Sequence, residues 1–113
     1  MRVTSGFWVA AYIRRVFAEG AFAAVVRRGA EEAGAIFVAI DWLDGTVDLY
    51  GPAPQTVFDD SRPTDRLFTR IGERIDRLEL QQRIASETRF DPDIWLVETE
   101  DRQGRSFLDI AAG

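Results

Sequence analysis

The strongest local constraint in this sequence is a pair of apolar runs separated by Asp44-Gly45. Residues 35–43 read AIFVAIDWL and residues 46–51 read TVDLYG, so both runs are rich in β-branched and aromatic side chains. Asp-Gly between two such runs is typical of a two-residue hairpin turn, because the turn needs positive φ at its central positions. We therefore expect an antiparallel pair of strands in which Trp42 lies opposite Val47.

That register assigns a face of the sheet to every side chain of the pair, because successive strand residues point to opposite sides. One face is expected to belong to the core and to carry Ile36, Val38, Ile40, Trp42, Val47 and Leu49. On the other face Asp41 lies opposite Asp48, where like charges repel. We expect Arg27 or Arg28 to compensate, with a bound cation as the alternative. A slipped register would remove the repulsion.

Helical spacing of apolar residues predicts two helices. The first begins near Gly6, with Ser5 as its N-cap, and Gly20 ends it as a left-handed cap. The second runs over residues 73–89. Its expected apolar face carries Ile75, Leu78, Gln82 and Ala85, with Leu80 and Ile84 partly off that face.

Three further segments are typical of strands, namely residues 21–28, 93–101 and 105–110. Residues 66–71 fit either a short strand or the entry to a helix. The last two strands are expected to form a hairpin through a loop of two or four residues. Either loop gives the same side-chain parity, and the longer one places Glu100 opposite Arg105 as a favourable pair.

Together these elements predict an α+β fold in one domain over residues 1–113. We expect a mainly antiparallel sheet of about five strands, with both helices on one face as the simplest layering. The expected order is helix, three strands, helix and two strands.

The second face of this sheet is predicted to mix apolar residues with charges. Its apolar members are Phe37, Leu43, Tyr50, Leu96 and Phe107, and they are our candidate interface. An exposed patch of this kind marks an interaction site. The alternative is that residues 56–65 or a helix cover the face.

Acidic residues gather at 91–101, where Pro92-Asp93 and Glu98-Thr99-Glu100 resemble a nuclease pattern in outline. Such a site needs its Asp and Glu to converge on a divalent ion beside a Lys. Asp93 and Glu98 have opposite parity on one strand, and the chain has no Lys, so we expect no catalytic residue here. A weaker candidate polar or metal cluster comprises Asp41, Asp48, Glu98 and Glu100 with Arg27 and Arg105.

Composition narrows the chemistry further. The chain has neither Cys nor His, which excludes thiolate catalysis and the usual general base near neutral pH. Its net charge of −5 disfavours binding to nucleic-acid backbones. No apolar run is long enough for a membrane span, and charged residues follow the N-terminal apolar stretch, so we expect a soluble cytoplasmic protein without cofactors.

Four ordered segments resemble the family called domain of unknown function 1491. They are SGFWVAAYIRR, GAFAAVVRRGAEEAGAIFV, LDGTVDLYGPAP and RFDPDIWLVETEDRQGRSFLD, and together they span nearly the whole chain. The family consists of small proteins found mainly in alphaproteobacteria and carries no assigned activity. The resemblance therefore implies a bacterial cytoplasmic origin and a single domain, and it implies no site residue.

Two functions remain open on the sequence. The first is a non-enzymatic interaction or regulatory module that forms a homodimer through the candidate interface or an edge strand. The alternative is a small-ligand or divalent-metal-dependent enzyme that uses the paired carboxylates with Arg27 or Arg105.

Overall fold

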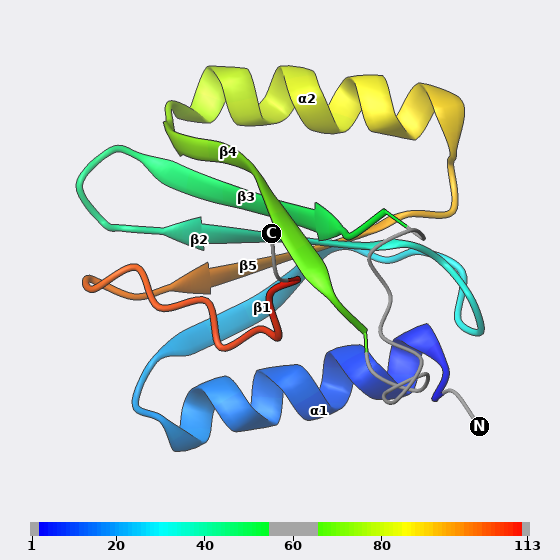
Figure 1. Ribbon diagram of the computed structural model, residues 1–113, viewed down its shortest axis with the longest axis horizontal. Helices are drawn as coiled ribbons and strands as arrows, with labels where there is room; N and C mark the ends of the chain where they lie inside the picture. The colour runs from blue at the N-terminus through cyan, green and yellow to red at the C-terminus, as the bar shows by residue number, and fades with distance from the viewer. Residues whose placement is uncertain (1–2, 55–65, 112–113) are drawn as a thin grey trace.

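The computed structural model describes residues 3–54 and 66–111 and contains one five-stranded sheet between two helices (Figure 1). In chain order the elements are α1 (Ser5–Ala18), β1 (Phe22–Arg27), β2 (Ile36–Asp41), β3 (Val47–Pro52), β4 (Phe68–Ile75), α2 (Arg77–Phe90) and β5 (Trp95–Glu100). The strands lie in the order β1-β5-β2-β3-β4. Only β2 and β5 are parallel; the other neighbours are antiparallel. The predicted α+β class, with two helices and a mostly antiparallel five-stranded sheet, is confirmed.

One strand lies elsewhere in the chain than expected. The ambiguous segment 66–71 contributes to β4, whereas residues 105–110 form no strand. The reason is that β5 already pairs with β1 on one side and with β2 on the other, so neither edge is free for a hairpin partner. The C-terminal segment instead crosses to β4, where the Phe68 N–H donates to the Asp109 carbonyl at 2.9 Å.

Helix α1 begins one residue earlier than expected, and its cap differs. The Thr4 hydroxyl accepts a hydrogen bond from the Phe7 N–H at 3.2 Å, which makes Thr4 the N-cap. Ser5 is buried, and its hydroxyl donates to the Gly34 carbonyl at 2.6 Å. Gly20 adopts φ 85°, as predicted for the residue that ends this helix.

Helix α2 begins four residues later than expected because residues 73–75 belong to β4. The Asp76 carboxylate accepts from the Glu79 N–H at 2.8 Å and is the N-cap. Leu80 is the buried residue of this helix, while Leu78 is 63% exposed. The expected apolar face was therefore rotated away from the true one.

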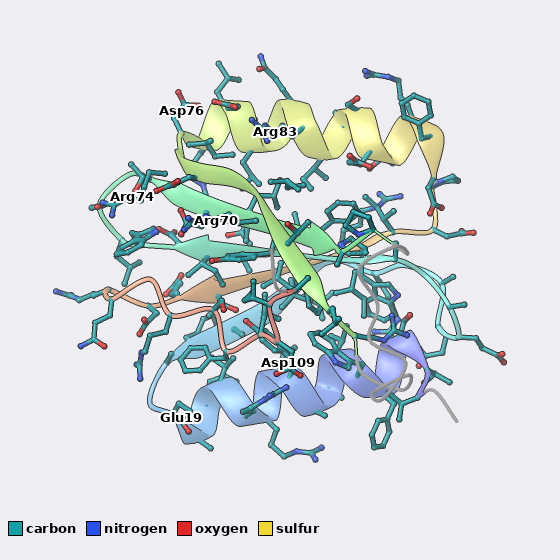
Figure 2. The ribbon with its side chains drawn as sticks, in the orientation of Figure 1. Glu19, Arg70, Arg74, Asp76, Arg83 and Asp109 are labelled. Carbon is teal, nitrogen blue, oxygen red and sulfur yellow. The ribbon has the colours of Figure 1, made fainter. Side chains whose placement is uncertain are left out.

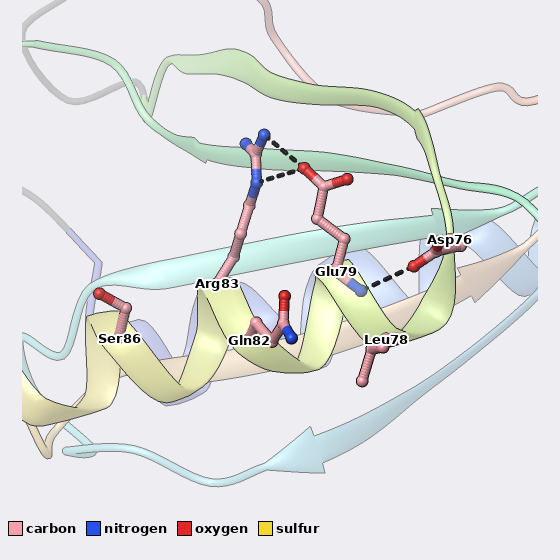
Figure 3. Close-up of a pocket in the computed structure, with 6 residues that line it drawn as sticks. All are labelled: Asp76, Leu78, Glu79, Gln82, Arg83 and Ser86. Atoms are coloured by element: carbon pink, nitrogen blue, oxygen red, sulfur yellow. Dashed lines mark hydrogen bonds and ion pairs between the residues drawn. The ribbon is translucent and has the colours of Figure 1, made fainter.

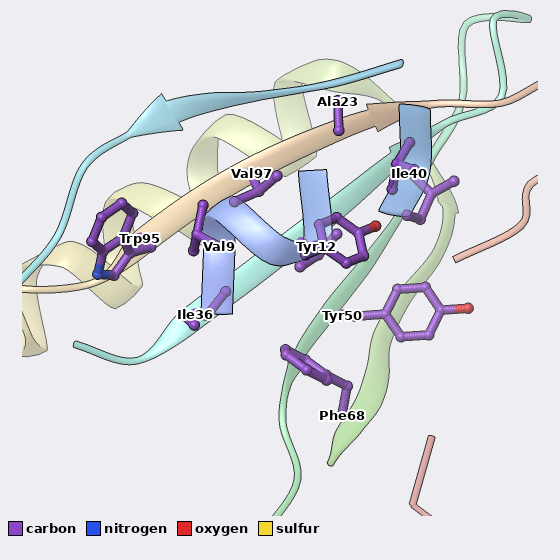
Figure 4. Close-up of a cluster of buried hydrophobic side chains, with 11 residues drawn as sticks. Val9, Tyr12, Ala23, Ile36, Ile40, Tyr50, Phe68, Trp95 and Val97 are labelled. Carbon is purple, nitrogen blue, oxygen red and sulfur yellow. The ribbon is translucent and has the colours of Figure 1, made fainter. Parts of the chain in front are cut away.

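The two helices lie on opposite faces of the sheet, so the expected layering is wrong (Figure 1). On the face that packs against α1, the buried cluster comprises Val9, Tyr12, Val16, Ala23, Ile36, Val38, Ile40, Tyr50, Phe68, Trp95 and Val97 (Figure 4). On the face that packs against α2, it comprises Phe37, Ala39, Val47, Leu49, Ile75, Leu80, Ile94 and Leu96. Every residue from Ile36 to Ile40 is buried. A central strand that is apolar on both faces needs a cover on each.

The β2–β3 register differs from the expected one by a single residue. Asp41 lies opposite Val47, and Ile40 lies opposite Asp48. The connecting loop is residues 42–46, with Leu43 at φ 62° and Gly45 at φ 93°. The Asp41 carboxylate accepts from the Leu43 N–H at 2.8 Å and stabilises this longer loop. Because a one-residue shift exchanges the two faces, Val47 and Leu49 pack under α2.

Candidate functional site

A groove lies between α2 and strands β5 and β1, on the α2 face of the sheet. Its volume is about 350 Å³, and we call it the α2 groove. It is lined by Val26, Arg27, Arg77, Leu80, Gln81, Ile84, Ala85, Leu96 and Glu98. It exists because α2 packs toward the β3 side of the sheet and leaves the part of this face over β5 and β1 open.

A β-bulge in β1 brings two consecutive side chains to this groove. Val25 pairs with Val97 and Arg27 pairs with Leu96, so Val26 is the extra residue. In a regular strand, Val26 and Arg27 would point to opposite faces. The bulge changes the direction of the strand locally, and both residues line the groove.

The inner wall of the groove is apolar. Leu80 and Leu96 are buried at 3% and 5% exposure, and Ile84 packs against them. Val26 stands at the rim and is 55% exposed. Apolar area that is only half covered by protein favours binding of an apolar group, because more of that area leaves water.

At the end of the groove near the start of α2, two carboxylates engage one guanidinium, which leaves a net negative charge there. Nη2 of Arg77 donates to both carboxylate oxygens of Glu98, at 2.8 and 3.0 Å, and Nη1 donates to Asp41 at 3.2 Å. The hydrogen bond to Glu98, together with the negative charges of Glu98 and Asp41, raises the pKa of Arg77 above its ordinary value. One guanidinium thus serves two carboxylates.

The second cationic side chain of the groove, Arg27, has no acidic partner among the described residues. Its Nη2 donates to the Pro92 carbonyl at 2.7 Å, which holds the guanidinium in place. Its Nε is buried and has no acceptor. The Nη donors that Pro92 does not engage belong to a guanidinium that lines the groove, so this side chain is suited to meet an incoming acceptor.

A larger hollow of about 530 Å³ lies on the outer side of α2, but its charged groups are already engaged (Figure 3). Asp76 caps the helix through the Glu79 N–H, and Glu79 pairs with Arg83 at 2.8 Å. Its lining comes from one helix and the residue before it, so no second element encloses a ligand. We therefore place the candidate site in the α2 groove.

The five residues of the predicted interface do not share a face, and that prediction is wrong. Phe37 and Leu96 are buried under α2, whereas Tyr50 belongs to the cluster on the α1 side. Leu43 lies in the β2–β3 loop and is 48% exposed. Phe107 packs against the α1-side cluster from the C-terminal segment. The cause is the one-residue register shift together with the missing C-terminal strand.

The predicted polar cluster is also divided. Asp41 and Glu98 meet at Arg77 on the α2 face. Asp48 is buried opposite Ile40, accepts from the Arg74 N–H at 2.8 Å and lies 3.7 Å from the Arg70 guanidinium. Figure 2 shows both Arg70 and Arg74 on β4, beside the β2–β3 hairpin. The expected compensation by Arg27 or Arg28 is therefore wrong.

At the end of β5 the expected pair between Glu100 and Arg105 is replaced by another. Arg105 donates to Asp101 through its backbone N–H at 2.8 Å and through its guanidinium at 2.8 and 3.1 Å. The side-chain hydrogen bond from Arg105 lowers the pKa of Asp101 below its ordinary value. Glu100 is exposed and lies opposite Phe22.

Among residues 3–54 and 66–111, no three acidic side chains are grouped closely enough to hold a metal ion. In the same part of the chain, no helix combines the length and the apolar character that crossing a lipid bilayer requires. Both findings concern the described residues alone.

Sequence reasoning named Arg27, Leu96 and Glu98 for other roles, and it named Leu80, Ile84 and Ala85 as apolar residues of the helix, with the first two partly off the expected face. It gave no role to Val26, Arg77 or Gln81. The i,i+4 spacing of Leu80 and Ile84 after a capping Asp76 was a usable signal for the true inner face of the helix. The bulge at Val26 leaves no signal in the local sequence.

The fold and the groove define a small α+β protein in which one face of the sheet is only partly covered. The chain belongs to a family described as "Protein of unknown function (DUF1491)", whose model matches residues 3–109. No curated protein in the comparison matches the chain.

Two solved structures resemble this one over their full length. The solution structure of a protein from A. tumefaciens is 43% identical, with a TM-score of 0.85, and the match covers 100% of this chain and 98% of that one. The crystal structure of a DUF1491 family protein from Caulobacter crescentus is 36% identical, with a TM-score of 0.78, over 99% and 100% of the two chains. These likenesses agree with the family membership and with the fold.

Proposed function

We propose that this protein is a non-enzymatic interaction module that forms a homodimer through the outer edge of β1. The proposal rests on one observation: in the described part of the chain, the outer edge of β1 has no strand paired to it and carries exposed apolar side chains. Within the described residues β1 pairs with β5 alone, and its side chains Phe22, Val25 and Val26 are 47%, 38% and 55% exposed. An edge strand presents unpaired backbone donors and acceptors, and apolar side chains beside them favour pairing with another strand.

The opposite edge of the sheet is protected in ways that β1 is not. Exposed Arg70, Glu73 and Arg74 line β4, and its pairing with β3 shifts register at two places, whereas β1 has a single shift, near its Arg27 end. The C-terminal segment also bridges to its first residue, Phe68. Charges, irregularities and a covering segment are the features that natural proteins use to prevent edge pairing. The contrast supports β1 as the edge that receives a partner.

A second copy of the chain satisfies the geometry of an antiparallel β1–β1 pair about a twofold axis. In that arrangement, the Arg27–Arg28 end of one strand lies near the Phe22 end of the other. The two basic ends are therefore kept apart, which avoids like-charge repulsion across the interface. The sheets of the two copies join into one continuous sheet.

The positions of the carboxylates support a non-enzymatic role over the metal-dependent alternative. Asp41 and Glu98 are engaged by Arg77, and Asp48 lies on the opposite face of the sheet. Asp41 and Glu98 converge on a guanidinium rather than on an open space, and Asp48, on the other face, does not join them as a third oxygen ligand.

Light scattering at high micromolar protein concentration tests the proposal. We expect a mass twice that of the 12.8 kDa chain. Phe22→Lys places a charge beside the unpaired backbone, and we expect it to give a monomer because lysine on an edge strand opposes pairing. Phe22 is half exposed, so the variant should fold.

Leu78→Lys is the matched control, because Leu78 is also an exposed apolar residue but lies on the outer side of α2. It should remain dimeric. A 12.8 kDa monomer for the unaltered chain contradicts the proposal, as does a dimer that Phe22→Lys leaves intact.

A further inference from the structure

We infer that the α2 groove binds a small amphipathic monocarboxylate, with a linear apolar chain along the helix and the carboxylate on Arg27. This inference goes beyond the proposed homodimer, because the ligand lies between α2 and the face of the sheet rather than along the outer edge of β1. It rests on three features of the groove: its shape, its apolar lining and its uneven charge.

The shape and lining suit a short hydrocarbon chain. Ligand pockets in proteins commonly enclose about 300–1,000 Å³ and are mostly apolar with few polar groups. The α2 groove, at about 350 Å³, lies at the small end of that range. Leu80 and Leu96 form its base, and Ile84, Ala85 and Val26 form its sides.

The distribution of charge in the groove indicates which polar group the ligand carries and where that group binds. Arg77 is engaged by Glu98 and Asp41, two negative charges against one positive, so this end of the groove does not attract an anion. Arg27 is held by the Pro92 carbonyl through one nitrogen and has no carboxylate partner in the described part of the chain. A guanidinium with free donors matches a carboxylate in geometry and charge.

A single available guanidinium also limits the class of anion. A phosphate monoester carries close to two charges and is bound by several donors at once. Here one positive charge faces an apolar wall, which matches a monoanion with an apolar tail. The Nη hydrogens of Arg27 that the Pro92 carbonyl does not accept remain for a carboxylate oxygen at this end of the groove.

The test is an NMR titration of the full chain with sodium octanoate, kept below the concentration at which it forms micelles. Backbone amides of Arg27, Leu80, Ile84 and Leu96 should shift together and saturate. Acetate, which lacks the apolar chain, and octan-1-ol, which lacks the charge, should each bind at least about tenfold more weakly, because a charge-assisted hydrogen bond and burial of the chain both contribute.

Two variants locate the site. Arg27→Gln should weaken octanoate binding about tenfold or more, since it removes the charge that pairs with the carboxylate. The matched control Arg14→Gln, an exposed position on α1, should bind as the unaltered chain does. Ala85→Trp fills the groove from an exposed position of α2 and should abolish the shifts while the fold is kept.

Octanoate that binds Arg27→Gln and the unaltered chain equally would overturn the inference, as would equal affinity for octan-1-ol. Groove amides that shift on diluting the protein, and do not respond to octanoate, would show a second copy of the chain in the groove and would also overturn it. The Phe22→Lys variant separates the two proposals, because it should still bind octanoate whether or not the unaltered chain is a dimer.

Discussion

The two faces of the sheet are each covered by a helix of 14 residues, yet the two covers are built differently. Helix α1 buries Val9, Tyr12 and Val16, and its Trp8 stacks on Tyr12 with ring centroids 5.1 Å apart. The other helix, α2, buries Leu80 alone. Apolar side chains of α1 therefore cover their face of the sheet along the helix. On the other face, α2 covers the sheet mainly at Leu80 and leaves the α2 groove beside it.

Polar contacts supplement the few apolar contacts that hold α2 to the sheet. Asp76 caps its first turn, Arg77 reaches Glu98 on β5, and Arg83 donates to the Ile71 carbonyl of β4. Contacts of this kind fix the helix at its ends and edges without filling the space beneath it. We infer that contacts on the α1 face contribute most of the free energy of unfolding and that the space for a ligand lies on the α2 face.

Truncating Trp95 should give the largest loss of stability. Trp95 is 1% exposed in the α1-side cluster, and its Nε1 donates to the Ala30 carbonyl at 2.8 Å. Trp95→Ala should lower the free energy of unfolding by about 3–5 kcal/mol, because it leaves a large cavity in a close-packed core. Urea denaturation measures this. Trp95→Phe, which keeps most of the volume, should cost clearly less; equal costs would show that the core there is loosely packed.

Truncating Leu80 is the corresponding change on the α2 face and should cost less. We expect Leu80→Ala to lower the free energy of unfolding by about 2 kcal/mol, at the low end for such a change, because the adjoining groove lets neighbours relax into the space. The same denaturation measurement applies. A loss as large as that of Trp95→Ala would mean that the two faces are equally close-packed.

Removing the Tyr12 hydroxyl tests how well the packing on the α1 face excludes water. This hydroxyl donates to the Ser106 carbonyl at 2.7 Å and lies 2.9 Å from the Thr99 hydroxyl. Tyr12→Phe should cost about 1–2 kcal/mol at pH 7, because a buried acceptor loses its donor. Thermal unfolding monitored by circular dichroism measures the difference.

The same side chain predicts a dependence on pH. Burial raises the pKa of Tyr12 to about 12, against 10.0 for a tyrosine in an unfolded chain. Its contribution is therefore complete below pH 10 and is lost as pH rises toward 12, where the unfolded state ionises first. The unaltered chain should lose more stability over that range than Tyr12→Phe. Parallel losses would show that water reaches the hydroxyl.

The smallest effect is expected at Arg77. Its side chain is 47% exposed, so solvent weakens its ion pairs with Glu98 and Asp41. Arg77→Gln should lower the free energy of unfolding by at most about 1 kcal/mol, and less at high salt. A double-mutant cycle with Glu98→Gln isolates the pair. A coupling well above that value would mean that charge pairing, rather than Leu80, is what holds α2.

Local signals in the sequence predicted much of the fold. Gly20 as the end of α1, the extents of β1, β2 and β3 to within two residues, and the α+β class follow from patterns confined to single elements. The register of β2 and β3 was missed because Asp-Gly favours a short turn, whereas Leu43 adopts positive φ, which branched side chains seldom do.

Local sequence patterns could not predict which distant segments pair in the sheet. Nothing near β5 indicates that β1 and β2 occupy both of its edges, which is why residues 105–110 were expected to pair with it. The side on which α2 packs was missed for a related reason. The unbroken apolar run Ile36–Ile40 did carry the signal that both faces need a cover. The groove follows from α2 packing toward β3 and from the bulge at Val26, neither of which is local.

Native-state hydrogen exchange of the backbone amides most directly tests the difference between the two faces. Amides of Val9–Val16 in α1 and of β5 should exchange only through global unfolding, with free energies near the total stability. Amides of Leu80–Ile84 in α2 should exchange through a local opening of clearly lower free energy, because few apolar contacts hold that helix to the sheet. Equal protection of the two helices would contradict the account.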